Sequence, residues 1–235
     1  MVTGEITLSV DGTPIRMKIT VPARRVKPQV MLPIFQKMAN VLTDIGVAAV
    51  ERVGARISCQ KGCGACCRQP IPLGEVELYY IALIIENLPE PRRTEIRQRF
   101  ANAAEHFGAS GWLESFEQCK DEAALKALIR SYFFEGIACP FLEEESCSIY
   151  PHRPIACREF LVTSSPANCA NLTEDSISQV ALPLKASDGL GRLAKGGKLS
   201  GKAFLPMVFA LDWVTAHPEG FEEKTGEEWL AEFFG

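Results

Sequence analysis

The sequence predicts a mainly α-helical protein with one N-terminal β-hairpin (α+β), in which irregular cysteine-rich loops are organised around metal. Three observations predict this fold class. Apolar residues recur at three- and four-residue steps along most of the chain, which is the period of an amphipathic helix. Apolar and polar residues alternate near the N-terminus, as in a half-buried hairpin. Eight of the nine cysteines fall into two runs where small residues and prolines predict loops.

The hairpin is predicted over residues 5–21. Apolar residues alternate on both sides of Asp11-Gly12, a dipeptide typical of a primed two-residue turn. One face is apolar and is expected to lie on the rest of the protein. After Pro28, an amphipathic pattern predicts one long helix that ends near Gly54 and leads into the first cysteine run.

Three helices are predicted between the two cysteine runs. The first, over residues 75–88, is apolar on all sides and is therefore expected to be deeply buried. The second covers roughly residues 91–107, and the third passes through Leu125 and ends at Gly136.

Glycine and lysine alternate over residues 185–202, which predicts a solvated loop. A basic lid over an anionic ligand is the alternative, although the glycine spacing matches no phosphate-binding loop. Helices at about residues 203–216 and 226–234 close the chain, and their large aromatic residues are expected to pack rather than bind.

A single domain is expected over residues 1–235. It divides into the hairpin and long helix (1–58), a metal-binding core (59–170), and a C-terminal loop with helices (171–235). With 47% apolar residues the chain can bury a sizeable core. A net charge of −4 and a pI near 5.6 argue against general nucleic-acid binding. No export signal or membrane-length apolar stretch is found, so we expect a cytoplasmic protein without a membrane span.

The first cysteine run places four thiols within nine residues, which is too dense for ordinary core packing. Small residues between them leave room for backbone N–H groups to face the sulfurs, as in a metal knuckle. Adjacent cysteines tend to point apart, so this run is not expected to complete a four-ligand site alone. The metal ligands predicted from both runs are Cys59, Cys63, Cys66, Cys67, Cys139, Cys147, Cys157 and Cys169.

Four plus four thiols allow two centres of four ligands, or one centre with spare cysteines. Either arrangement would tie the two runs together, so metal is expected to contribute to folding stability. A disulfide framework is the alternative, and the odd cysteine count and missing export signal disfavour it. Cys119 stands apart from both runs and is expected to take no part.

Two arginines within the second run are predicted to surround the metal with positive charge. Four thiolates on zinc or on an oxidised four-iron cluster leave a net charge of about −2, which needs nearby cations and hydrogen-bond donors. Arg153 and Arg158 are well placed to supply them, and surface salt bridges are the alternative. His152 is a further candidate ligand, although the thiols suffice without it.

The cysteine motifs resemble the CxxCxxCC (YkgJ-like) cysteine-cluster family of zinc- or iron-chelating domains. The resemblance covers roughly residues 59–170. It rests on Cys63-Gly64-Ala65-Cys66-Cys67, Cys139-Pro140-Phe141-Leu142, Cys147-Ser148-Ile149-Tyr150, Arg153-Pro154 and Cys157-Arg158. Glu75 stands where family members carry an acidic residue, whereas Cys59 lies one residue further from Cys63 than the family pattern implies.

The resemblance implies a metal-binding role. The family is similar to the cysteine-rich part of flagellin lysine N-methylases, which implies an iron–sulfur protein, most readily 4Fe-4S, with redox or methyl-transfer activity and a redox or protein partner. No methylase motif beyond the cysteines occurs in this chain, so catalysis stays open. A zinc-stabilised structural or interaction module without catalysis is the alternative.

A radical S-adenosylmethionine enzyme is a third hypothesis. Cys59, Cys63 and Cys66 reproduce the C-x3-C-x2-C spacing of those enzymes. Such enzymes need a barrel of alternating strands and helices, and this sequence predicts one hairpin and mostly helices, which disfavours that hypothesis.

Overall fold

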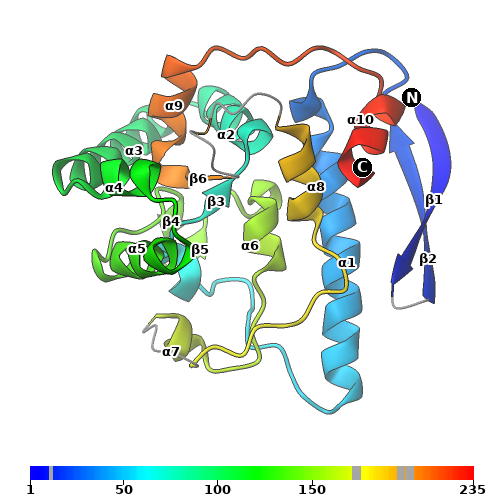
Figure 1. Cartoon of the computed structure of the whole chain (residues 1–235), viewed down its shortest axis with the longest axis horizontal. Coiled ribbons are helices and arrows are strands. Elements are labelled where there is room, and N and C mark those ends of the chain that lie inside the picture. The colour runs from blue at the N-terminus through cyan, green and yellow to red at the C-terminus, as the bar shows by residue number, and fades with distance from the viewer. Residues whose placement is uncertain (11–12, 171–175, 195–198, 200–203) are drawn as a thin grey trace.

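The computed structural model describes residues 1–10, 13–170, 176–194, 199 and 204–235, and confirms the predicted fold class (Figure 1). Most of the regular structure in the described ranges is helical, and a long antiparallel hairpin lies at the N-terminus. Within those ranges, no helix is both long and apolar enough to cross a membrane.

The hairpin consists of β1 (Val2–Val10) and β2 (Thr13–Val21), paired in antiparallel register from one end to the other. The predicted turn at Asp11-Gly12 lies outside the described residues. At the end of β2, Met17, Ile19 and Val21 turn buried side chains onto the core, as the alternating pattern predicts.

The long predicted helix is present as α1 (Leu32–Arg52), preceded by a short 3-10 helix, η1 (Pro28–Val30). It ends at Arg52, two residues before the predicted Gly54, whose φ of 78° is a left-handed conformation that glycine adopts without strain. The buried face of α1 carries Leu32, Phe35, Met38, Ala39 and Leu42.

Three predicted helices of the insert are α2 (Glu75–Glu86), α3 (Arg92–Ala109) and α5 (Glu122–Phe134). A fourth helix between them, α4 (Trp112–Gln118), was not predicted. Trp112 and Phe116 are one turn apart and both buried. Two aromatic residues give too short a periodic signal to indicate a seven-residue helix by themselves.

An aromatic cluster joins these helices around Phe107, which has no exposed surface. Its ring stacks on Tyr132 of α5 with centroids 4.1 Å apart, and meets Trp112 edge-on at 5.5 Å. Phe209 of η4 (Met207–Phe209) completes the contact from the C-terminal part. Burial of these large rings is a major source of stability in this half of the molecule.

The predicted solvated loop is wrong where the chain forms α8 (Ala186–Leu193). Leu190 and Leu193 are buried, and a Cβ on Gly189 would lie 2.6 Å from the ring of Phe233, so this glycine permits close helix packing. Tertiary burial therefore overrides the low helix propensity of glycine. The remainder of the predicted loop and lid, at 195–198 and 200–202, lies outside the described residues.

The C-terminal segments differ in part from the prediction. Where one helix was expected, the chain forms β6 (Leu205–Pro206), η4 and then α9 (Ala210–Ala216). β6 pairs with β3 (Pro72–Leu73), which lies just after the first cysteine run. The last helix, α10 (Gly226–Phe234), is confirmed and begins with a capping box.

The described elements of the two cysteine runs are all short, as predicted, and none exceeds five residues. They are η2 (Ala65–Arg68), β4 (Leu142–Glu143), β5 (Ser146–Cys147), η3 (Tyr150–His152), α6 (Ile155–Glu159) and α7 (Pro166–Cys169). Phe141, Ile149 and Ile155 from these loops are buried in the main core. The loops therefore share the core of the helices.

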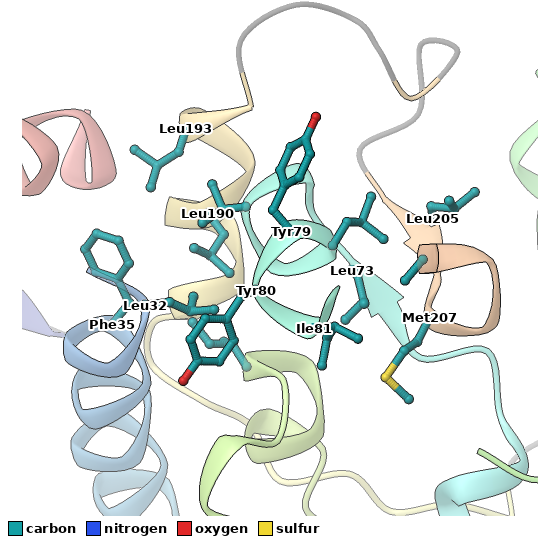
Figure 2. Packing of buried hydrophobic residues seen from close by; sticks show 14 of the residues in the cluster. Leu32, Phe35, Leu73, Tyr79, Tyr80, Ile81, Leu190, Leu193, Leu205 and Met207 are labelled. Carbon is teal, nitrogen blue, oxygen red and sulfur yellow. The ribbon is translucent and has the colours of Figure 1, made fainter. Parts of the chain in front are cut away.

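In Figure 1, α3, α4 and α5 gather on one side of the molecule, α1 and the hairpin lie on the other, and α6 lies between them. Figure 2 shows how α1, α2 and α8 pack together: Leu32 and Phe35 of α1 lie toward Leu190 and Leu193 of α8, with Tyr80 of α2 beside them. This packing fixes α6, and with it part of the second cysteine run.

Candidate metal centre

All eight cysteines of the two runs line one cavity of about 100 Å³. They are Cys59, Cys63, Cys66, Cys67, Cys139, Cys147, Cys157 and Cys169. All nine cysteines of the chain are free thiols. Cys119, at the end of α4, lies outside this cavity, and its Sγ donates to the carbonyl oxygen of Asp121 at 3.3 Å. Segments about 80 residues apart in sequence are thus brought to one place.

The first run curls around the cavity through local turns. The N–H of Cys63 donates to the carbonyl oxygen of Gln60 at 3.1 Å, and the N–H of Cys67 donates to that of Gly64 at 2.9 Å. Gly62 has a φ of 89°, a left-handed conformation that a side chain would strain. Small residues at these positions let four cysteines share a tight loop.

Direct contacts join the first run to the second. The N–H of Cys139 donates to the carbonyl oxygen of Cys67 at 2.7 Å. Arg68 forms a two-pronged ion pair with Glu145, at 3.1 and 2.6 Å. Gly64 packs so closely that a Cβ there would lie 2.6 Å from Leu142. The protein itself therefore holds the two groups of cysteines together.

Helix α6 carries Cys157 and is anchored by α2. Glu77 is 3% exposed, and its Oε1 accepts a hydrogen bond from the N–H of Ile155 at 2.8 Å, at the first residue of α6. A carboxylate at this end stabilises a helix start because the first N–H groups lack intrahelical partners. Sequence reasoning missed Glu77, because an acid in an apolar helix gives no sign of its distant partner.

Backbone N–H groups face several of the sulfurs. The N–H of Val162 donates to Sγ of Cys59 at 3.3 Å. Backbone hydrogen bonds from Phe141 and Leu142 lower the pKa of Cys139, and one from Ile149 lowers that of Cys147, in both cases against a larger effect of burial. Such bonds stabilise thiolates and are typical of metal sites with cysteine ligands.

Burial dominates the acidity of most of these thiols. It raises the pKa of Cys139 to about 12 and that of Cys169 to about 11, and it raises the pKa of Cys157 well above its usual range. Cys66 is the exception, because the thiol of Cys67 donates to its sulfur and lowers its pKa to about 7. The same bond raises the pKa of Cys67. Several thiolates together would thus require a cation among them.

The sulfurs fall into two electrostatic neighbourhoods that meet at Cys66. The inner neighbourhood contains Cys67, Cys139, Cys147 and Cys157. Ionised thiols within it repel one another and the thiolate of Cys66, which raises their pKa values. The outer neighbourhood contains Cys59, Cys63 and Cys169. The negative charge of the Cys66 thiolate likewise raises the pKa of Cys59 and of Cys169. Four thiols therefore lie on each side if Cys66 is counted with the outer group.

The donor chemistry fits a thiolate-ligated metal. No histidine, aspartate or glutamate is found among the described residues that line this cavity. Within the same described part of the chain, no three such side chains or cysteines are arranged to hold a metal ion as they stand. The cavity thus collects sulfur donors, and rotation about Cα–Cβ bonds would be required to aim four of them at one ion.

The two arginines lie beside the cavity. Arg153 lines it and stacks over the ring of Tyr150 at 4.2 Å, and its buried Nε has no hydrogen-bond partner in the described part of the chain. Arg158 is 6% exposed and donates to the side chain of Asn40 and to the carbonyl oxygens of Arg153 and Pro151. No carboxylate in the described residues forms an ion pair with either guanidinium, so the alternative of surface salt bridges is not seen there.

Two other sequence candidates lie away from the thiols. The Nδ1 of His152 is 3.0 Å from the hydroxyl of Tyr80, and the residue does not line the cysteine cavity. Glu75 is buried in the first turn of α2 and does not line it either. Tyr150, which the sequence analysis named only as part of a family motif, does line the cavity.

Comparison with known proteins gives one positive result. No match was found among curated proteins or among solved structures. Residues 58–178, slightly more than half of the chain, match the CxxCxxCC family, described as a putative zinc- or iron-chelating domain. This range contains both cysteine runs and the residues that line their cavity, apart from Met207, and the chain belongs to the CxxCxxCC family.

Proposed function

We propose that this chain is a cytoplasmic iron–sulfur protein that holds a 4Fe-4S cluster between its two cysteine runs. The observation that carries the proposal is the cavity lined by eight thiols with no carboxylate or imidazole among its described lining residues. An all-sulfur donor set is the set that iron–sulfur clusters use.

The inner thiols, Cys67, Cys139, Cys147 and Cys157, are the proposed ligands of this cluster. Cys139 is buried and Cys67, Cys147 and Cys157 are half-buried, which would keep a cluster out of bulk water. Backbone N–H groups on Cys139 and Cys147 support the same assignment. The outer group, with Cys59, Cys63, Cys66 and Cys169, is proposed as a second ligand set.

Arg153 and Arg158 have the proposed role of balancing negative charge. Burying a guanidinium without a carboxylate partner is costly unless another anion lies nearby. The thiol of Cys157, once ionised, would favour the charged form of Arg158. A bound cluster would supply one-electron chemistry, while the residues of the chain exclude water and adjust its charge.

A zinc-stabilised module without catalysis is the second candidate. The small volume of the cysteine cavity, about 100 Å³, favours it, because a single ion needs less room than a four-iron cluster. Four of the same thiols would then serve a structural role alone.

Metal and sulfide analysis of protein purified without oxygen separates the two candidates. The iron–sulfur proposal expects a coloured protein that contains iron and acid-labile sulfide in comparable amounts. A colourless protein with zinc and no sulfide would refute it. Cys157→Ser should lose metal, whereas Cys119→Ser, outside the cavity, should keep all of it.

The number of centres can be read from two further variants. If the inner and outer groups bind separate centres, Cys147→Ser and Cys169→Ser should each lose about half of the metal, since four thiolates complete one centre. If one of the two variants keeps the full metal content, its group is not a ligand set.

A further inference from the structure

A second cavity, of about 560 Å³, adjoins the cysteine cavity. The two share Cys66, Ile71, Cys157 and Phe160 on their walls. The larger cavity lies between the segment after η2, the start of α2, α6 and α8, and much of its wall is apolar. Its volume is in the range of pockets that bind small organic molecules.

Buried carboxylates give this cavity its charge. Glu77 and Glu159 are 3% and 5% exposed, and both line it. Glu77 accepts from the N–H of Ile155, and Glu159 accepts from the N–H and hydroxyl of Ser187, at 3.2 and 2.6 Å. These are neutral donors, and neither acid forms an ion pair with a cation of the described chain. A buried acid without a cationic partner is a costly arrangement unless something else supplies the charge.

The cationic side chains near Glu77 and Glu159 form no ion pair with them in the described part of the chain. Lys185 lines the cavity but forms no ion pair with either glutamate in the described part of the chain. Arg158 acts on Glu77 only through space, because its guanidinium is held by Asn40 and two carbonyl oxygens at the wall of a different cavity. Asp188 adds a third carboxyl group to the lining.

One polar group in this cavity also lacks a partner. Nε2 of Gln69 is buried and makes no hydrogen bond with any described residue. A buried amide N–H without an acceptor is costly, so it calls for an acceptor oxygen. Among apolar walls, the described lining therefore offers two buried acids, the carboxyl group of Asp188 and the unpartnered amide N–H of Gln69.

We propose that this second cavity binds a small organic cation, an alkylammonium group with an apolar body and an acceptor oxygen. The ammonium group would lie against Glu77 and Glu159, the apolar body against Ile71 and Phe160, and the oxygen within reach of Gln69. This inference rests on the proposed function, because a ligand bound here would lie next to the proposed metal centre. It adds the chemical class of that ligand.

Three probes of similar size test the charge preference: n-butylammonium, 1-butanol and butyrate, titrated calorimetrically into the purified 235-residue chain. The proposal expects n-butylammonium to bind at least about tenfold more tightly than 1-butanol, with butyrate weakest, because only the cation pairs with the acids. Equal binding of amine and alcohol, or tighter binding of butyrate, would overturn it.

Two glycine variants test the location. Gly191 of α8 lines the cavity, and a Cβ built on it meets nothing within 4 Å, so Gly191→Leu should fold and fill the space. Gly108 of α3 is also helical and open but lies elsewhere, so Gly108→Leu is the matched control. We expect about a tenfold loss of n-butylammonium affinity in Gly191→Leu only. Gly74→Leu, open on another wall, is the second filling variant, and unchanged affinity in both would overturn the proposal.

Metal and sulfide contents of the same samples separate this proposal from the proposed function. Zinc-containing or metal-free protein that still prefers the cation would refute the iron–sulfur proposal and support the cavity. Iron–sulfur protein without the preference would do the reverse.

Discussion

The cysteine runs (residues 59–69 and 139–169) and the helical frame (α1 to α5 and α8 to α10) are held together by different forces. The frame buries whole aromatic side chains, among them Phe35, Phe107 and Trp229, each at most 1% exposed. The runs contain elements of five residues or fewer, joined by a few hydrogen bonds and one ion pair. Burial in the frame is favourable over a large area, whereas the runs add fewer apolar side chains to the core, among them Phe141, Ile149 and Ile155.

The two regions should differ in how much their stability depends on bound metal. A frame held by ring packing should keep its structure when metal is absent. The runs bring eight thiols together, and most of these have a raised pKa because charge is costly there. Metal that binds thiolates would convert this cost into a stabilising interaction, so the runs should depend on it far more than the frame does.

The largest expected effect is that of Cys66→Ser. Cys66 lies where the two neighbourhoods of thiols meet, and its thiol is the one whose pKa is lowered. Structural zinc sites contribute on the order of 10 kcal/mol to folding, and a weaker ligand forfeits much of that. We expect loss of bound metal and of soluble yield together, measured by metal analysis of the soluble fraction.

Cys119→Ser is the matched control for that change, since Cys119 lies outside the cysteine cavity. It should keep metal and yield. A soluble Cys66→Ser variant with full metal content would show that Cys66 is not needed to bind the metal or to fold the cysteine runs.

A large effect within the frame is expected from Phe107→Ala. The ring is fully buried and contacts Tyr132, Trp112 and Phe209, so its removal should cost about 3–5 kcal/mol of unfolding free energy. Chemical denaturation measures it. Phe134→Ala, at a residue 67% exposed, should change stability little. If the loss for Phe107→Ala disappeared in metal-depleted protein, the frame would not be independent of metal.

The same contrast explains how much could be predicted from sequence. The hairpin, α1, α2, α3, α5 and α10 have long periodic patterns, and all six are present. Helix α8 was missed because its glycines indicate a loop, while its burial depends on Phe233 of a distant helix. Local propensity cannot report a contact that only the folded chain makes.

At the candidate site, sequence indicated the ligand residues but not the cavity beside them. Cysteine spacing alone indicated which thiols to consider, because few other roles suit so dense a run. The cation-poor cavity beside them was not predicted, since Glu77 and Glu159 come from separate helices. Their lack of ionic partners is a property of the tertiary structure and has no sequence signal.

A pH-dependent effect is expected at Glu77, which links frame and runs through its bond to Ile155. Burial raises its pKa from 4.5 to about 7 in the folded protein. The folded state therefore holds this proton after the unfolded chain has lost it, so stability falls as pH rises from about 4.5 to about 7. The total contribution is about 3 kcal/mol.

Glu77→Gln tests this, since glutamine keeps an oxygen for the N–H of Ile155 but carries no charge. Compared with the parent protein at equal metal content, the variant should gain relative stability as pH rises from about 4.5 to about 7, by up to about 3 kcal/mol in denaturation experiments. If the unfolding free energies of the two proteins changed in parallel with pH, Glu77 would not have the raised pKa that a buried carboxylate without a cationic partner should have.

The smallest effect is expected from Gly64→Ala, which tests the contact between the runs themselves. A new Cβ would lie 2.6 Å from Leu142 and 2.9 Å from the carbonyl oxygen of Glu145. The side chain of Leu142 can move, but the turn at Glu144 and Glu145 has φ values of 46° and 57° and little freedom to shift.

The added methyl group should therefore separate the runs slightly and cost about 1–3 kcal/mol, as overpacking usually does. Denaturation and metal analysis should both report it, because displaced thiols bind metal less well. Gly108→Ala, in an open helical position, should be neutral or slightly stabilising. Loss of stability with full metal content would mean that the metal centre tolerates movement of the runs, and that their contact matters for the fold alone.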